Sequence, residues 1–233
     1  MSPDSPVNGD TRRRASMDTS AMQWTPSPSG SVWRKRLHMV GGAESGQVTS
    51  LVRYQPGASF PAHDHPEGEE ILVLEGIFSD EHGDWHAGMH LLNPEGFRHA
   101  PRSQPGCLIF VKLRQYAGEG RVYRRTDVNR LDWRASGRPG VEQKVLYDEP
   151  GFADVTRLER WCPGAAPGPL SSPGGLELFV LEGALEEAGG RLATGAWLRI
   201  PAGDVLDARS PEGCVLYLKQ GAVATLRRAG GDA

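Results

Sequence analysis

The chain has 233 residues, including 30 glycines and 18 prolines, and a formal net charge of −3; this length suits one or two domains with a buried core. The turn-rich composition is typical of many short strands and stays below the glycine and proline content that signals disorder. The charge and the lack of a long apolar run exclude an electrostatic nucleic-acid binder and a helical membrane protein, so we expect a cytoplasmic protein with no nucleic-acid or membrane partner.

The first part of the chain differs in composition from the rest. Residues 1–22 are rich in Ser, Asp, Arg and Pro and poor in apolar side chains. This composition predicts a disordered N-terminal tail. We place the first domain at residues 23–127, where short apolar runs alternate with turns that contain glycine and proline.

Two histidines of the first domain are spaced to share one face of a strand. His63 and His65 lie two residues apart, and alternate side chains of a strand point to the same side. Glu69 follows a tight Pro-Glu-Gly turn and begins the apolar run Ile71–Leu74, which predicts a buried strand that ends at Gly76.

A second cluster repeats the pattern of strand, tight turn and histidine. Gly88, Pro94 and Gly96 precede His99 in this cluster. Imidazole is a good ligand for zinc, iron, copper or nickel, and a carboxylate oxygen beside it extends the choice to manganese. The candidate metal ligands are therefore His63, His65, Glu69 and His99.

The two clusters follow the patterns G-x5-H-x-H-x3-E-x6-G and, eleven residues later, G-x5-P-x-G-x2-H. They resemble the two signature motifs of the cupin superfamily. The segments Gly68–Gly76, Phe78–Asp84 and His99–Ser103 are similar to ChrR-type cupins, named for the metal-binding sensory domain of an anti-sigma factor. The resemblance runs from about Val32 to Gln115. It implies an all-β double-stranded β-helix, or jelly roll, whose barrel holds one divalent ion: zinc or iron, with manganese or nickel as alternatives.

The chain contains an internal repeat. At an offset of 107 residues, Val48–Lys112 aligns with Val155–Lys219 without a gap, and 24 of the 65 positions are identical. The identities concentrate at glycine and proline, which fix the backbone conformations of tight turns. We therefore predict two tandem cupin barrels, the second at residues 128–226 and followed by a disordered tail at 227–233.

The second repeat lacks the candidate ligands. Three aliphatic side chains and one hydroxyl stand in their places: Leu170, Ser172, Leu176 and Leu206. These side chains cannot hold a divalent ion but can fill a barrel with apolar packing, so we predict one metal ion per chain. Glu70 survives in the repeat as Glu177, which favours a structural role for Glu70 and leaves Glu69 as the ligand.

Coordination number separates two classes of function. Four protein ligands complete a tetrahedron around zinc and leave no open position. The resemblance to ChrR-type cupins implies a sensory or regulatory site that binds zinc or another divalent ion, and this is our first hypothesis. The same four ligands on octahedral iron leave two positions for dioxygen and a chelating substrate, which favours an Fe(II)-dependent dioxygenase acting on a small carbonyl or phenolic compound. The sequence leaves open whether the protein is an enzyme. A sugar or nucleotide isomerase is disfavoured because the sequence shows no basic pocket.

The partners can be only partly predicted. We expect a small-molecule ligand at the metal, and the sequence leaves open whether chains form homodimers. In ChrR-type anti-sigma factors, a separate N-terminal helical domain with His and Cys zinc ligands binds the sigma factor. This chain has no cysteine before Cys107 and no room for that domain, so we expect no direct sigma-factor binding.

Overall fold

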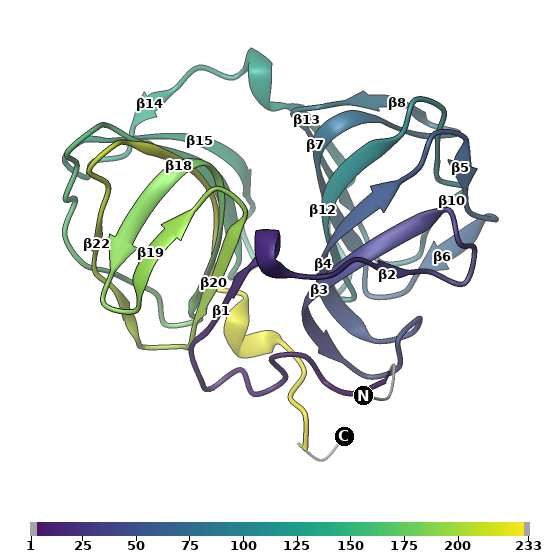
Figure 1. Cartoon of the computed structure of the whole chain (residues 1–233), viewed down its shortest axis with the longest axis horizontal. Helices are drawn as coiled ribbons and strands as arrows, with labels where there is room; N and C mark the ends of the chain where they lie inside the picture. The colour runs from purple at the N-terminus through teal and green to yellow at the C-terminus, as the bar shows by residue number, and fades with distance from the viewer. Residues whose placement is uncertain (1–3, 231–233) are drawn as a thin grey trace. The chain divides into compact units, whose positions relative to one another are not determined.

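The computed structural model describes residues 4–230. It consists of two units built almost entirely of short β-strands (Figure 1). Within the described residues, the helical elements are single turns of 3₁₀ helix at Thr19–Ala21, Val128–Arg130 and Val223–Thr225. None of the helices in this part of the chain is long and apolar enough to cross a membrane.

The first unit contains residues 4–9, 23–130 and 227–230 of the described chain. Its long sheet has the strand order β13-β9-β7-β12-β4-β3-β2. A second, smaller pairing of β10 with β6 carries the predicted histidines. In sequence, the strands are β2 (Thr25–Pro26), β3 (Val32–Val40), β4 (Gln47–Tyr54), β5 (Ala58–Ser59), β6 (His63–His65), β7 (Glu69–Asp80), β8 (Gly83–His86), β9 (Met89–Asn93), β10 (Phe97–His99), β11 (Arg102–Ser103), β12 (Cys107–Leu113) and β13 (Arg124–Asp127).

The second unit contains residues 10–22 and 131–226. Its long sheet has the order β1-β20-β18-β23-β16-β15-β14, which repeats the order of the first sheet element by element. The prediction of two tandem cupin barrels is confirmed. The strands are β1 (Ala15–Asp18), β14 (Arg134–Ala135), β15 (Val141–Asp148), β16 (Val155–Trp161), β17 (Leu170–Ser171), β18 (Leu176–Glu187), β19 (Gly190–Ala193), β20 (Ala196–Ile200), β21 (Val205–Leu206), β22 (Ala208–Arg209) and β23 (Cys214–Gln220).

The segment expected to be a disordered N-terminal tail is ordered from residue 4 onward. Strand β1 pairs antiparallel with β20, and Arg14 forms ion pairs with Asp204 and Glu187. The prediction was wrong because the edge of β20 supplies backbone hydrogen-bond partners that composition does not reveal. Residues 1–3 of the predicted tail lie outside the described residues.

The strand that leads into each barrel belongs to the other unit. Strand β1 precedes the first barrel and completes the second sheet, whereas β13 precedes the second barrel and pairs with β9 of the first sheet. The sequence contains a signal of this arrangement, because Asp18 and Trp24, which end and follow β1, recur as Asp127 and Trp133, which end and follow β13. Their offset is 109 residues rather than 107, so the gap-free comparison from Val48 onward misses them.

The C-terminal segment is also ordered as far as the structure describes it. The backbone N–H of Arg227 donates to the side-chain oxygen of Gln47 at 2.7 Å, and the N–H of Ala229 donates to the carbonyl of Gly9 at 3.0 Å. The predicted disorder of residues 227–233 is therefore wrong for residues 227–230, and residues 231–233 lie outside the described chain.

The glycines shared by the two repeats form matching turns. Gly76 and Gly183 have φ of +72° and +70°, a left-handed conformation that favours glycine. A Cβ at Gly76 would lie 2.1 Å from the carbonyl oxygen of Gly106, and one at Gly183 would lie 2.2 Å from that of Gly213. The same backbone approach therefore requires glycine in both barrels.

Candidate metal centre

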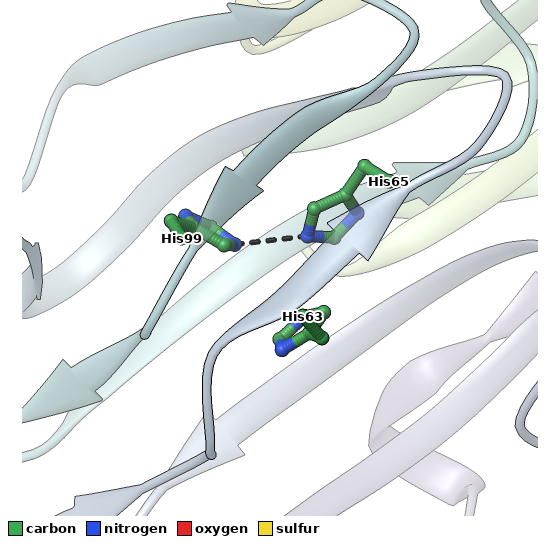
Figure 2. Close-up of side chains that lie close together, drawn as sticks. All are labelled: His63, His65 and His99. Carbon is green, nitrogen blue, oxygen red and sulfur yellow. Dashed lines mark hydrogen bonds between the residues drawn. The ribbon is translucent and has the colours of Figure 1, made fainter.

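The three predicted histidines come together on the paired strands β6 and β10. His63 lies directly opposite His99 in the antiparallel register, and His65 lies two residues along the same strand. One ring nitrogen of each histidine lies within 4.8 Å of the others, and the Nε2 atoms of His65 and His99 are 2.9 Å apart. Figure 2 shows the three rings gathered in one place. The prediction that His63 and His65 point to the same side of a strand is confirmed.

The local surroundings set the protonation of these rings. Nδ1 of His63 lies 2.8 Å from the carbonyl oxygen of Pro61. A carbonyl only accepts, so Nδ1 donates this hydrogen bond, and Nε2 is the nitrogen that is available to a metal. Burial lowers the pKa of His65, and the positive charge of Arg114 acts in the same direction. His65 is therefore held neutral, which is the form that binds a metal.

Asp80 lies behind His99. Its Oδ2 is 3.1 Å from Nδ1 of His99, and its Oδ1 accepts from the backbone N–H of His82 and from the Trp85 indole. Burial raises the pKa of Asp80, but these hydrogen bonds outweigh it and the net pKa is lowered. An ionised Asp80 accepts from Nδ1 of His99 and leaves Nε2 for a metal, as second-layer carboxylates do.

The pKa of His99 is raised, whereas that of His65 is lowered. Burial lowers the pKa of His99, but the hydrogen bond to Asp80 and the charge of Glu69 outweigh burial, so the net pKa is raised. A metal at His99 therefore competes with a more tightly bound proton than it would at an ordinary histidine. Asp80 was not predicted as a site residue, although it lies in the segment Phe78–Asp84 that resembles ChrR-type cupins.

Glu69 and Glu70 face opposite sides of strand β7. One carboxylate oxygen of Glu69 lies 3.7 Å from Nε2 of both His65 and His99, and Asn93 donates to the same oxygen at 2.7 Å. Glu70 instead bonds His90 at 2.7 Å and accepts from Tyr116. The structural role predicted for Glu70 agrees with these contacts.

The donor set fits a divalent ion. The three predicted histidine ligands converge, and Glu69 lies 3.7 Å from two of them. The two facing Nε2 atoms must either share one proton or be bridged by a cation. Neutral imidazoles with one buried carboxylate suit zinc, iron, nickel or manganese. The assignment of His63, His65, Glu69 and His99 as ligands stays a prediction.

Comparison with known proteins supplies the family. The model of the ChrR cupin-like domain matches residues 12–117 and 122–224. This chain belongs to the ChrR cupin-like family. The first match begins in the segment that holds β1, and both barrels are covered. A search of curated proteins gives no match.

Solved structures share the cupin fold at low sequence identity. The protein YlbA from Escherichia coli has 16% identity and a TM-score of 0.69, covering 92% of each chain. The E. coli pirin YhhW, solved with nickel(II), has 14% identity and a TM-score of 0.64, with 93% of this chain and 100% of that one covered. Salicylate 1,2-dioxygenase from Pseudaminobacter salicylatoxidans has 14% identity and a TM-score of 0.58, covering 76% and 71%.

A cavity of about 450 Å³ inside the first barrel of this cupin reaches the three histidines. Strands β3, β4 and β12 supply much of its wall. Apolar and aromatic side chains dominate the surface near the histidines: Val52, Tyr54, Phe60, Phe78 and Ile109. Burial, with the negative charge of Glu69, raises the pKa of Tyr54 well above its usual value, so its hydroxyl stays neutral.

Three arginines also line this cavity: Arg34, Arg36 and Arg114. The sequence shows no basic pocket, whereas the fold brings these three arginines to one cavity, which the carboxylates of Glu44, Asp64 and Glu69 also line. The arginines lie outside both metal motifs, and Arg114 reaches the same cavity as Arg34 and Arg36 because β3 and β12 lie on either side of β4 in the sheet. A partial signal exists in the sequence, because Arg34 and Arg36 are two residues apart and share a face of β3.

The second barrel places leucines where the first has its histidines. Leu170 pairs with Leu206 in β17 and β21, as His63 pairs with His99. Leu176 and Leu206 are buried at 0% and 1% exposure. The predicted apolar packing in the place of the metal site is confirmed for these residues.

Proposed function

We propose that this protein is a metal-dependent enzyme, an Fe(II) dioxygenase that acts on a small organic molecule in the first barrel. The observation that carries the proposal is the cavity of about 450 Å³ lined by His63, His65 and His99. A site that serves only to hold an ion has no need of an adjoining space of this size, which is in the range of small-molecule pockets.

Each residue of the site has a separate role in this proposal. His63, His65 and His99 hold the iron, and Glu69 is a fourth ligand or accepts a substrate proton. Asn93 fixes the carboxylate of Glu69, and Asp80 fixes the tautomer of His99. Iron(II), when bound, supplies dioxygen activation at positions that the protein leaves open. The apolar wall excludes water from the reacting groups.

The test is oxygen uptake by protein purified and reconstituted with iron(II) without air. The panel contains small carbonyl, phenolic and carboxylic compounds. We expect at least one compound to stimulate oxygen consumption by the wild type and by His86→Ala, a control at an exposed histidine. His99→Ala and zinc-loaded wild type should show no stimulation. Oxygen uptake that no compound stimulates would contradict the proposal.

A sensory role is the second candidate, and the position of Glu69 favours it. One oxygen of Glu69 lies 3.7 Å from two of the ring nitrogens, so a small movement would give zinc a closed set of four ligands. The match to the ChrR cupin-like family supports this alternative. It predicts one tightly held zinc ion, no turnover with any compound, and a change in stability when a ligand is substituted.

A further inference from the structure

We propose that the first barrel selects a small monocarboxylate with an apolar body, and that Arg36 and Arg114 bind its carboxylate. The inference names a substrate class for the proposed function. It rests on that function for the reaction, whereas binding of the carboxylate can be measured without any turnover.

Three arginines and three carboxylates, Glu44, Asp64 and Glu69, line the cavity, and Glu44 is the carboxylate that pairs with the arginines. Arg34 donates two hydrogen bonds to Glu44, at 2.5 and 3.0 Å. Arg36 donates to the carbonyl of Ala43 at 3.2 Å and lies 3.7 Å from the same Glu44. One carboxylate therefore serves two guanidinium groups. Since the side chain of Glu44 is 52% exposed, it can move aside at low cost when another carboxylate arrives.

Arg114 is the third cation of this group. Among the described residues, none gives its guanidinium a hydrogen bond or an ion pair. Its backbone is held in place, because its N–H donates to the carbonyl of Gly68 at 3.0 Å and its carbonyl accepts from Gln47 at 2.7 Å. The preceding residue, Leu113, pairs with Glu69. Arg114 is thus anchored beside the candidate metal ligand.

The backbone conformation at Arg114 is also unusual. Its φ is +59°, in the left-handed region that is uncommon for residues other than glycine, asparagine and aspartate. The corresponding residue of the second repeat is Gly221, with φ of +88°. Non-glycine residues in such conformations cluster at ligand sites. The conformation is consistent with a side chain held there for binding.

The second barrel has lost the three arginines together with the metal ligands. In the first barrel, Arg34 pairs with Val52 and Arg36 with Ser50. The equivalent strand pairs of the second barrel place Gln143 opposite Glu159 and Val145 opposite Arg157. Glutamine, valine and glycine therefore replace Arg34, Arg36 and Arg114 in the barrel without a metal site.

The second barrel instead holds its own carboxylate. Glu159 is buried at 1% exposure and accepts from Arg157 at 2.8 Å, from Arg138 at 3.1 Å and from the Trp161 indole at 2.8 Å. The first barrel has Val52 at the position of Glu159 and a cavity beside it. The first barrel thus has a space, with three other arginines on its wall, where the second barrel holds a carboxylate of its own, and a carboxylate from outside can enter that space.

The rest of the cavity indicates the body of the ligand. Phe60, Phe78, Val52 and Ile109 offer apolar surface on the same cavity as the arginines. Guanidinium groups bind carboxylates through paired hydrogen bonds, while an aromatic or branched aliphatic group gains from burial against these side chains. A monocarboxylate with an aromatic or branched aliphatic group matches both the arginines and the apolar side chains of the cavity.

The test is titration calorimetry with the full-length chain, once loaded with zinc and once after chelation. The probes are phenylacetate and 4-methylpentanoate, each compared with its neutral amide. We expect at least one acid to bind at least ten-fold more tightly than its amide in both preparations. Arg114→Gln should weaken binding of that acid at least ten-fold, and Arg114→Lys should restore part of the loss.

Arg130→Gln is the matched control, because the Arg130 side chain is 88% exposed and outside the cavity. It should bind the acids as the wild type does, and the melting temperature of each variant shows whether it is folded. Equal affinity for acid and amide, unchanged affinity in folded Arg114→Gln, or no binding of either acid would overturn the inference. Acid-selective binding without oxygen uptake would support the inference and contradict the proposed dioxygenase activity. Oxygen uptake with neutral compounds alone would support the dioxygenase activity and contradict the inference.

Discussion

Asp80 accepts a hydrogen bond from Nδ1 of His99 at 3.1 Å, while Nε2 of the same ring lies 2.9 Å from Nε2 of His65. The carboxylate therefore determines which nitrogen of His99 is available to a metal. Asp80 lies on β7 and His99 on β10, so the long strand that carries Glu69 at its start also orients a histidine at its end.

Asp80→Asn should weaken metal binding by about 10–100-fold, the usual effect of removing such a carboxylate. The amide nitrogen of asparagine can face Nδ1 and favour the wrong tautomer of His99. Competition with a chromophoric zinc chelator measures the change. An affinity equal to that of the wild type would contradict the role given to Asp80.

The same substitution should have a pH-dependent effect on stability in the metal-free protein. The net pKa of His99 is raised above 6.5 when folded, so protonation of His99 stabilises the fold below pH 6.5, and this stabilisation is lost as pH rises through the folded pKa. Asp80→Asn removes the charged partner. It should therefore lower the free energy of unfolding by about 1–3 kcal/mol more at pH 6 than at pH 8.5.

Urea unfolding in the presence of a chelator measures this difference at the two pH values. Other groups with shifted pKa, such as His65, are present in both proteins and largely cancel in the comparison. A loss of stability that is equal at both pH values, or larger at pH 8.5, would contradict the assignment.

Glu69 and Glu70 provide a matched pair of substitutions on one strand. Glu69→Gln should weaken metal binding, because it removes the charge that lies 3.7 Å from two ring nitrogens. Glu70→Gln should leave the metal stoichiometry at the wild-type value and lower stability by about 1–3 kcal/mol, because Glu70 bonds buried His90. Zinc titration and thermal unfolding of both variants separate the roles. Loss of metal from a folded Glu70→Gln protein would reverse the assignment.

Substitutions at Gly76 and Gly57 distinguish the cost of backbone strain from the cost of a steric clash. Both have positive φ, +72° and +78°, so alanine at either position costs about 1–2 kcal/mol of backbone strain. A Cβ at Gly57 meets nothing within 4 Å, whereas one at Gly76 would lie 2.1 Å from the carbonyl oxygen of Gly106. Gly76→Ala should therefore destabilise by about 3 kcal/mol or more in total. Urea unfolding of both variants tests this, and equal losses would contradict the predicted clash.

The metal motifs were predictable from sequence because their geometry is local. His63 and His65 share a face through the alternation of a strand, and the turn glycines fix the loops on either side. Comparison of the repeats added a second signal, since leucines replace His63 and His99 while the turn glycines remain. The fold class followed from the resemblance of these motifs to those of cupins, and the internal repeat predicted a second barrel.

The remaining features depend on contacts between distant segments. The ordering of β1 depends on an open edge of β20, about 180 residues later. The arginines of the cavity depend on β3 and β12 lying on either side of β4 in the sheet, which brings Arg36 and Arg114 to the same cavity. Asp80 was present in a segment that resembles the family, but only the fold brings its carboxylate to His99.

The central claim is that His63, His65 and His99, with Glu69, hold one divalent ion in the first barrel. It is tested most directly by the metal content of protein purified without air or chelators from cells supplied with iron, manganese and zinc. We predict one equivalent in the wild type and in His86→Ala, and none in folded His99→Ala. A wild type without metal, or a His99→Ala protein that keeps its full equivalent, would contradict the account.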